Sequence, residues 1–231
     1  MTEIKYPTLS VLMPVYNEEP TLLACLDRVL ASPHATEIII VDDGSKDGTA
    51  EIIKNISNKR VKTFLHGKNQ GKGTAVRTAL AHATSEYIII QDADLEYDPE
   101  DFAKLLKPAA DGKSEAVYGS RFTGEHRNMM FWHLMGNKFL SFTTNLLYNT
   151  TLSDMETCYK LIKRDVIKDI KLRSHRFDFE PEITAKLLKR GIKIYEVPIS
   201  YAGREFDEGK KITWRDGIVA LWTLIKYKFM E

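Results

Sequence analysis

The sequence predicts an α/β fold in which helices flank a mostly parallel central sheet. Within roughly the first 100 residues, four short runs rich in β-branched residues alternate with segments of helical period, which is the pattern of a parallel sheet covered by helices. Each of these runs ends in polar or glycine-rich residues. The chain has 231 residues, 43% of them apolar and 28% charged, which is enough for one folded domain with a sizeable core.

The elements follow in order along the chain. The apolar runs predict strands over residues 9–13, 37–41, 61–65, 87–90, 116–119 and 192–199. Apolar stripes at helical spacing predict core-facing helices over 22–30 and 75–83. A segment rich in methionine and aromatic residues covers 129–148, a helix is expected over 182–190, and a last helix of about four turns follows a basic loop at 203–212.

The charge balance and the cysteines narrow the function classes. The net charge is +1, so no overall field attracts nucleic acid, and any affinity for phosphate must be local. Cys25 and Cys158 form no CxxC or zinc spacing, which favours a reducing compartment and a role as small core side chains. No signal peptide and no run of about 20 apolar residues is present, so we expect a cytoplasmic protein that meets a membrane, if at all, peripherally from the cytoplasmic face.

Two carboxylates directly after the fourth strand give the sharpest functional signal. Ligands of open α/β sheets bind at the carboxyl ends of the strands. Asp92 and Asp94, separated by Ala93, could both face a divalent cation there, and Glu96 could supply a third oxygen. Taken alone, the motif is more often an acidic turn that solvates a loop. Its position after a buried strand favours metal binding.

Two further strand ends carry polar candidates. After the second strand, a turn with Asp47 or Thr49 as helix cap explains much of the 42–49 segment but leaves the adjacent Asp42 and Asp43 unexplained, and a carboxylate there could accept hydrogen bonds from a nucleobase or ribose. After the first strand, Tyr16 could stack on a base and Glu18 could bind ribose, although the same residues also suit the start of a helix.

The glycine-rich segment 67–73 does not match a phosphate-binding P-loop. Only three residues separate Gly67 from Gly71, and Gly73 stands where a P-loop has a hydroxyl. We interpret the segment as a turn whose Lys72, at a helix N-terminus, contacts a phosphate.

Together these motifs resemble the inverting family 2 glycosyltransferases of GT-A fold, the nucleotide-diphospho-sugar transferase fold. Within them the sequence is most similar to the dolichol-phosphate mannosyltransferase and polyprenyl-phosphate glycosyltransferase branch. The resemblance runs from about residue 9 to residue 211 and rests on the order and separation of five motifs: Pro14-Val15-Tyr16-Asn17-Glu18, Asp42-Asp43-Gly44-Ser45, Gly71-Lys72-Gly73, Asp92-Ala93-Asp94 and Gly119-Ser120-Arg121-Phe122.

The resemblance implies roles for individual residues. The nucleoside and its phosphates would be bound by one set of residues: Pro14, Tyr16, Glu18, Asp43, Lys72, Asp92, Ala93, Lys210 and Lys211. The metal, Mg or Mn, would be held by Asp92, Glu96 and, principally, Asp94. Arg121 corresponds to an arginine near the donor diphosphate and acceptor phosphate, and Arg204 to the basic loop that closes over the phosphates.

The sequence departs from that branch at the acceptor. Glu96 stands where the mannosyltransferases often have Gln, which adds negative charge beside the metal, and Arg127 and the 153–160 segment match the family's lipid-phosphate residues only loosely. Asp154 would be the base for a hydroxyl acceptor, whereas a phosphate acceptor needs positioning more than deprotonation. A role for Asp154 as a turn cap is equally compatible with the sequence.

We therefore expect a divalent-metal-dependent, inverting transferase that moves a hexose from UDP-glucose or GDP-mannose to polyprenyl or dolichyl phosphate. The catalytic residues would be Asp94, Arg121, Asp154 and Arg204. The alternatives are a transferase of the same fold acting on a glycan or protein hydroxyl, a sugar-phosphate nucleotidyltransferase, and a non-catalytic sugar-nucleotide-binding protein. No nucleic-acid partner is expected, and the sequence does not predict the oligomeric state.

The domain organisation is expected to be a catalytic domain over residues 1–211 and an amphipathic C-terminal helix over 212–231, without a transmembrane segment. The apolar positions of that helix are accompanied by Arg215, Lys226 and Lys228. The helix could lie in a membrane interface with its basic residues at the headgroups, or it could pack on the sheet or on a second subunit. The sequence leaves both open.

Overall fold

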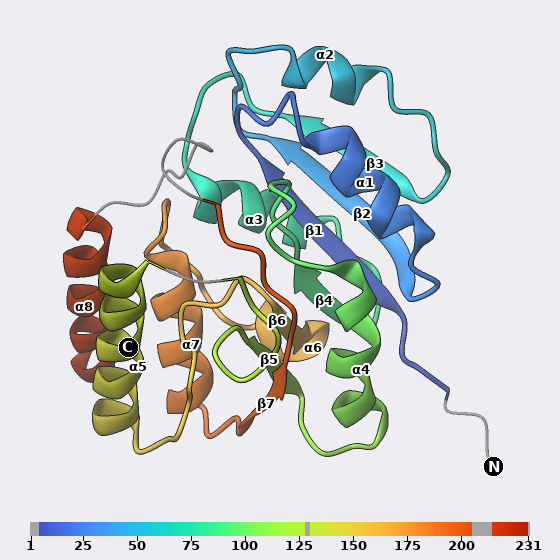
Figure 1. Ribbon diagram of the computed structural model, residues 1–231. Helices are drawn as coiled ribbons and strands as arrows, with labels where there is room; N and C mark the ends of the chain where they lie inside the picture. Colours follow the sequence, from blue (N-terminus) through green and yellow to red (C-terminus); the bar gives the residue numbers. More distant parts are fainter. Residues whose placement is uncertain (1–4, 128–129, 205–213, 231) are drawn as a thin grey trace.

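The computed structural model describes residues 5–127, 130–204 and 214–230 (Figure 1). Its centre is a seven-stranded sheet in the order β3-β2-β1-β4-β6-β5-β7, with β6 antiparallel to both of its neighbours and every other pairing parallel. The strands are β1 (Leu9–Val15), β2 (Ala35–Asp42), β3 (Val61–Leu65), β4 (Tyr87–Ile90), β5 (Ala116–Ser120), β6 (Lys160–Lys163) and β7 (Ile194–Pro198). The predicted mostly parallel α/β fold is confirmed.

Helices flank this sheet. They are α1 (Leu22–Ala31), α2 (Thr49–Lys54), α3 (Lys72–Ala81), α4 (Phe102–Ala110), α5 (Phe131–Tyr148), α6 (Arg164–Lys168), α7 (Phe179–Lys189) and α8 (Trp214–Phe229), with a short 3-10 turn, Pro99–Asp101, before α4. The predicted helices over 22–30 and 75–83 correspond to α1 and α3. Helix α7 begins three residues before its predicted start at 182.

The burial of the central strands explains why the sequence predicted them. Strands β1 and β4 are buried along their whole length, so nearly every position is apolar and the strand appears as a continuous hydrophobic run. Both are paired on each side, β1 with β2 and β4, and β4 with β1 and β6. Their carboxyl ends therefore open at the middle of one sheet edge.

Strand β6 is the one strand of the sheet that the sequence did not predict. It has only four residues, Lys160–Lys163, which is too short to show an alternating pattern. Ile162 pairs with Ile88 of β4 and with Ala116 of β5, so two long-range ladders make it a strand. Because β6 runs antiparallel, its first residues lie at the edge where the parallel strands end.

Helices α5 and α8 lie side by side beyond α7, at the left of Figure 1. Tyr148 Oη donates a hydrogen bond of 2.7 Å to the carbonyl oxygen of Leu224, and a small apolar cluster of Leu140, Met155, Ala220 and Leu224 joins the two helices. The methionine- and aromatic-rich segment thus forms most of α5, and the last predicted helix is α8. Within the described ranges, no helix is long and apolar enough to cross a membrane.

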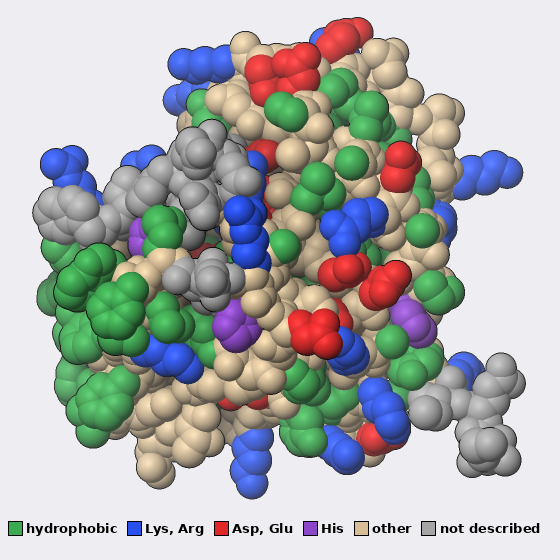
Figure 2. Space-filling model, in the orientation of Figure 1, with side chains coloured by type: hydrophobic (Ala, Val, Ile, Leu, Met, Phe, Trp, Pro, Cys, Tyr) green, Lys and Arg blue, Asp and Glu red, His purple; other side chains and the backbone are tan. Residues whose placement is uncertain are grey.

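The outer faces of these two helices are strongly apolar. Figure 2 shows hydrophobic side chains gathered on the left of the molecule, over α5 and α8. Trp132 is 81% exposed and Trp222 is 63% exposed, and the other large exposed side chains of the pair are Phe131, Met135, Phe139, Phe142, Leu146, Ile218, Val219 and Phe229. A surface of this kind is typical of an interaction site.

Candidate functional site

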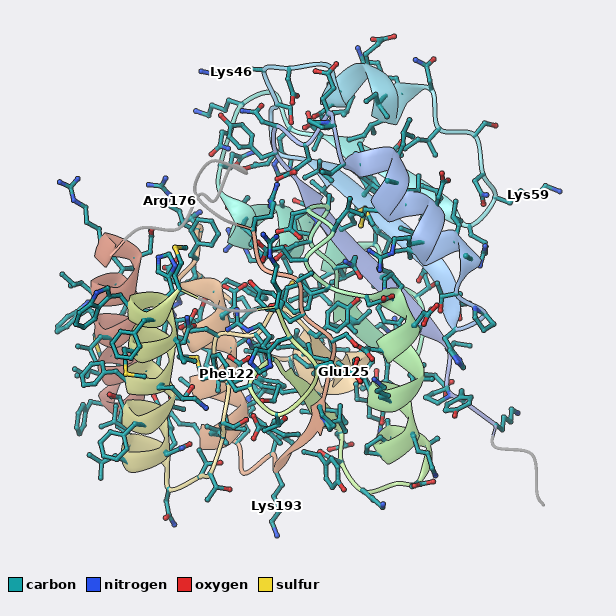
Figure 3. The ribbon with its side chains drawn as sticks, viewed as in Figure 1. Lys46, Lys59, Phe122, Glu125, Arg176 and Lys193 are labelled. Atoms are coloured by element: carbon teal, nitrogen blue, oxygen red, sulfur yellow. The ribbon has the colours of Figure 1, made fainter. Side chains whose placement is uncertain are left out.

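A cavity of about 1090 Å³ opens at the carboxyl ends of the parallel strands and extends to helices α5 and α8. Its polar end includes the loops after β1, β2 and β4, and its apolar end includes Trp132, Leu140 and Leu221. Figure 3 labels two of the side chains that line it, Arg176 and, below it in this view, Phe122. Most of the predicted site residues line this one cavity: Pro14, Tyr16, Glu18, Asp43, Lys72, Asp92, Ala93, Asp94, Glu96, Arg121 and Arg204.

The two acids after β2 have different tasks. Asp42 turns back into its own loop, where its carboxylate accepts hydrogen bonds from the backbone N–H and the hydroxyl of Ser45. Asp43 lines the cavity, and its carboxylate accepts hydrogen bonds from the backbone of Gln70 at 3.0 Å and of Gly71 at 2.7 Å, and contacts His66 Nδ1 at 2.8 Å. Asp43 therefore organises the loop before α3 at the wall of the cavity.

Gly71 is needed for that loop conformation. Its φ is +93°, in a region that residues with a side chain rarely adopt, and its N–H reaches Asp43 only in this geometry. Lys72 follows this loop and is the first residue of α3, as the sequence predicted. Its ammonium group points to two carboxylates and not to solvent. Lys72 Nζ lies 2.9 Å from a carboxylate oxygen of Asp92 and 3.0 Å from Oε1 of Glu180.

Arg204 bridges the loops after β1 and β4. Its guanidinium lies 3.2 Å from Glu18 Oε1, 3.2 Å from Asp94 Oδ2 and 3.7 Å from Glu96 Oε1. Glu96 is held further by Tyr201, whose hydroxyl donates to Oε2 at 2.7 Å, and by the backbone N–H of Arg204 at 2.8 Å. Three acids from two separate motifs thus share one cation.

The acids of the β4 loop repel one another. The pKa of Asp94 is raised to about 7 by burial first and then by the negative charges of Asp92 and Glu96, and Arg204 offsets only part of this. Among the residues that the structure describes, no three acids, histidines or cysteines are arranged to hold a metal by themselves. Mg²⁺ and related ions commonly use one or two carboxylates and complete their shell with phosphate oxygens and water. The oxygen donors and the excess negative charge of Asp92 and Asp94 fit an ion bound in that way.

Arg121, at the end of β5, is fixed by a buried ion pair. Its Nε lies 2.7 Å from Asp154 Oδ2 and its Nη2 lies 2.7 Å from Oδ1, and its backbone N–H donates to Oδ2 at 3.0 Å. The side chain of Asp154 is fully buried. Its two oxygens pair with two guanidinium nitrogens, which is the geometry of a bidentate, charge-assisted contact. Lys210 and Lys211 lie outside the described residues.

The structure also adds two cavity residues that the sequence analysis missed. Glu180, in the first turn of α7, lines the cavity beside Lys72, and Glu156 lines it from the turn before β6. An acid in the first turn of a helix ordinarily serves the helix dipole, and Glu156 lies in a segment whose strand was not predicted. Neither position carried a local pattern that could have revealed it.

Comparison with known proteins gives the family and the relatives. A family model described as "Glycosyl transferase family 2" matches residues 10–171. The UDP-N-acetylglucosamine–dolichyl-phosphate N-acetylglucosaminyltransferase of Methanococcus voltae is 29% identical over 239 residues, covering 94% of this chain and 95% of that protein. The low-salt glycan biosynthesis hexosyltransferase Agl6 of Haloferax volcanii is 32% identical over 86% of this chain, which spans about half, 49%, of that protein.

Solved structures show the same fold. Glucosyl-3-phosphoglycerate synthase from Mycobacterium tuberculosis in complex with UDP superposes with a TM-score of 0.75 at 19% identity, over 97% of this chain and 81% of that one. The same enzyme in complex with Mn²⁺, UDP and glucosyl-3-phosphoglycerate gives a TM-score of 0.72 at 17% identity, again over 97% and 81%. With the family model covering most of the chain and the fold matching these GT-A structures, the protein belongs to glycosyl transferase family 2.

Proposed function

We propose that this transferase moves a hexose from a nucleotide-diphospho-sugar, UDP-glucose or GDP-mannose, to polyprenyl or dolichyl phosphate with inversion at the anomeric carbon. The observation that carries the proposal is the shape of the cavity, which joins a polar end at Asp94 to an apolar end between α5 and α8, with Arg121 also on its wall. An acceptor with a phosphate head and a hydrocarbon tail matches both ends. The name of the Methanococcus voltae relative, a transferase to dolichyl phosphate, supports the same acceptor class.

The donor would lie along the sheet edge. The nucleoside would bind between the loops after β1 and β2, where Pro14, Tyr16 and Asp43 line the cavity. Asp92 and Asp94 would hold a Mg²⁺ or Mn²⁺ ion, whose charge stabilises the departing diphosphate. Solved complexes of the Mycobacterium tuberculosis enzyme contain Mn²⁺ or Mg²⁺ together with UDP, which supports this choice of ions.

In the transfer step, a phosphate oxygen of the acceptor forms a bond to the anomeric carbon while the bond from that carbon to the diphosphate breaks. The nucleoside diphosphate leaves with the electron pair. Because the acceptor oxygen is already anionic, the protein has to position it rather than remove a proton. Arg121 is suited to this, since Asp154 holds its guanidinium rigidly at the cavity wall.

The rival function, transfer to a hydroxyl, would need Asp154 as a general base. Both oxygens of that carboxylate already accept hydrogen bonds from Arg121, and the side chain is fully buried. Oxygens engaged in this way are not presented to a hydroxyl group in the cavity. The geometry therefore favours the phosphate acceptor. Membership of glycosyl transferase family 2 argues against the other two alternatives, a sugar-phosphate nucleotidyltransferase and a non-catalytic sugar-nucleotide-binding protein.

The apolar surface of α5 and α8 supports peripheral contact with a membrane, where a polyprenyl acceptor resides. Large exposed side chains such as Trp132 and Trp222 are accompanied on the same helices by Lys138, Lys226 and Lys228. Aromatic rings beside basic residues are typical of helices that lie at a lipid–water interface.

A transfer assay tests the function. Purified protein would be incubated with Mg²⁺ or Mn²⁺, polyprenyl phosphate in vesicles, and one radiolabelled nucleotide sugar at a time, and the product extracted into organic solvent. We expect label in the lipid phase from one donor, lost with a chelator and with Asp94→Asn. Asp165→Asn, a surface carboxylate paired with Lys168, is the matched control and should leave transfer unchanged. Label that stays in water, with the donor bound, would contradict the lipid acceptor.

A further inference from the structure

Two carboxylates that line the cavity, those of Glu156 and Glu180, have no part in the chemistry described above. Glu180 is only 4% exposed, and Glu156 lies in the turn that leads into β6. Glu180 Oε2 and Glu156 Oε1 are shielded from solvent, and neither has a hydrogen-bond partner among the described residues. Buried polar atoms are nearly always paired, because an unpaired one costs about 1–3 kcal/mol. Both residues line the cavity, so their carboxylate groups lie beside a ligand bound in it.

The sheet order places this pair beyond the metal loop. Along the edge, Asp43 follows β2, Pro14 ends β1, Asp92 follows β4, and Glu156 precedes the antiparallel strand β6. A donor whose nucleoside lies at β1 and β2, and whose diphosphate lies at β4, extends next toward β6. The group that follows the diphosphate in such a donor is the sugar.

Both carboxylates are held in position. Lys72 Nζ lies between Asp92 and Glu180, so the acid of the metal loop and the acid of α7 share one ammonium group. On the other side, the buried Lys160 donates to the backbone carbonyl oxygens of Met155 and Thr157, which fixes the turn that carries Glu156. Rigid hydrogen-bonding groups of this kind can distinguish one ligand from another.

The charge of Glu156 and Glu180 disfavours an anionic ligand beside them. Glu156 and Glu180 repel each other, and the pKa of Glu156 is raised to about 8 by burial first and then by Glu180. Carboxylate oxygens accept hydrogen bonds from hydroxyl groups. Sugar hydroxyl groups can donate to them, whereas the two carboxylates would repel an anionic group beside them.

We propose that Glu156 and Glu180 bind hydroxyl groups of the donor's sugar and select a neutral hexose over a hexuronic acid. This inference rests on the proposed function, because it takes the donor to be a nucleotide-diphospho-sugar. It assigns sugar specificity to residues outside the metal and nucleoside motifs. The two residues act by binding, and the transfer chemistry stays with the groups named above.

Calorimetric titration can separate the sugar from the nucleotide. Wild-type protein with Mg²⁺ or Mn²⁺ would be titrated with UDP, UDP-glucose and UDP-glucuronic acid, and with GDP and GDP-mannose. The variants are Glu156→Gln and Glu180→Gln. Glu115→Gln, which changes a surface carboxylate paired with Lys163, is the matched control. Thermal unfolding would verify that each variant is folded, and Glu156→Gln carries the test alone if Glu180→Gln does not fold.

For the variants we expect the affinity for the free nucleoside diphosphate to stay within about twofold of the wild-type value. The affinity for the nucleotide hexose should fall about tenfold or more. A loss of this size corresponds to one hydrogen bond to a charged group. Wild-type protein should bind UDP-glucuronic acid more weakly than UDP-glucose, and the variants should narrow that gap. The inference would be overturned if the variants bound the nucleotide hexose as tightly as wild type does. It would also be overturned if their affinities for the nucleoside diphosphate and for the nucleotide hexose fell equally. Either result would leave the proposed function standing. If wild-type protein binds neither nucleoside diphosphate, both fail.

Discussion

Arg204 Nη2 lies 3.2 Å from Asp94 Oδ2, which joins the segment after β7 to the loop after β4. The same guanidinium contacts Glu18 and Glu96, so it offsets the charge of three acids at the polar end of the cavity. This explains how a sheet edge with so many carboxylates is stable. It also places a cation where the donor's diphosphate is proposed to bind.

Arg204→Ala should therefore impair donor binding and transfer. With the guanidinium removed, the three acids repel one another and the diphosphate loses a positive partner, so we expect kcat/KM for the nucleotide sugar to fall by about 10²-fold or more. Steady-state transfer kinetics would measure it. Arg190→Ala is the control, because that arginine donates to the carbonyl oxygen of Asp169 at the surface, away from the cavity. Equal kinetics for the two variants would contradict the role of Arg204.

Asp154→Asn should affect stability more than chemistry. It leaves the guanidinium of Arg121 buried without its counter-ion, which typically costs about 3–5 kcal/mol of unfolding free energy. Urea denaturation would measure this loss. Transfer to polyprenyl phosphate, assayed where the variant is folded, should fall by no more than about tenfold, whereas loss of a general base usually costs 10²-fold or more. A folded variant that has lost several orders of magnitude would favour the hydroxyl acceptor.

Trp222→Ser should weaken attachment to membranes. The indole of Trp222 is 63% exposed on α8, and its loss removes apolar surface that would enter the lipid interface. In flotation with vesicles that contain anionic lipid, we expect the bound fraction to drop severalfold, and nucleotide binding to stay unchanged. Leu23→Ser is the control, since Leu23 is an apolar side chain, 51% exposed, on the distant helix α1. If both substitutions behave alike, α8 is not the membrane-facing surface.

Glu37→Gln should reduce stability at neutral pH but not in acid. Burial alone would raise the pKa of Glu37, yet hydrogen bonds from Lys62, Ser10 and Thr84 lower it to about 2, from 4.5. A carboxyl group whose pKa is depressed by folding contributes stability above its unfolded pKa and loses it as the pH falls toward the folded value. The window is therefore pH 4.5 down to about 2.

We expect Glu37→Gln to lower the free energy of unfolding by about 2–3 kcal/mol at pH 7, and by much less near pH 2–3, where wild type has itself lost that contribution. Urea denaturation at both pH values would show it. Glu115→Gln, at a surface ion pair, should change little at either pH. A deficit for Glu37→Gln that does not depend on pH would contradict the ionic contribution.

Local sequence patterns predicted much of the fold and of the site. The strands 61–65 and 87–90 were predicted with their observed bounds. Strand 87–90 is buried and therefore a continuous apolar run, whereas the partly exposed strand 61–65 was predicted from its β-branched residues. The residues that end such strands must meet at one edge, so the positions of Asp43, Asp92 and Asp94 beside one cavity followed from the order of the elements.

What the sequence determined by itself was thus the mostly parallel α/β fold, the family and the strand ends that form the site. Only the tertiary structure decided that four residues from Lys160 become the antiparallel strand β6, that Asp154 forms an ion pair with Arg121, and that Glu156 and Glu180 line one cavity. The physical reason is the distance along the chain over which each interaction acts. Periodicity and turn chemistry act between near neighbours, whereas these contacts join residues that are distant in the chain and acquire their partners only when the sheet is assembled.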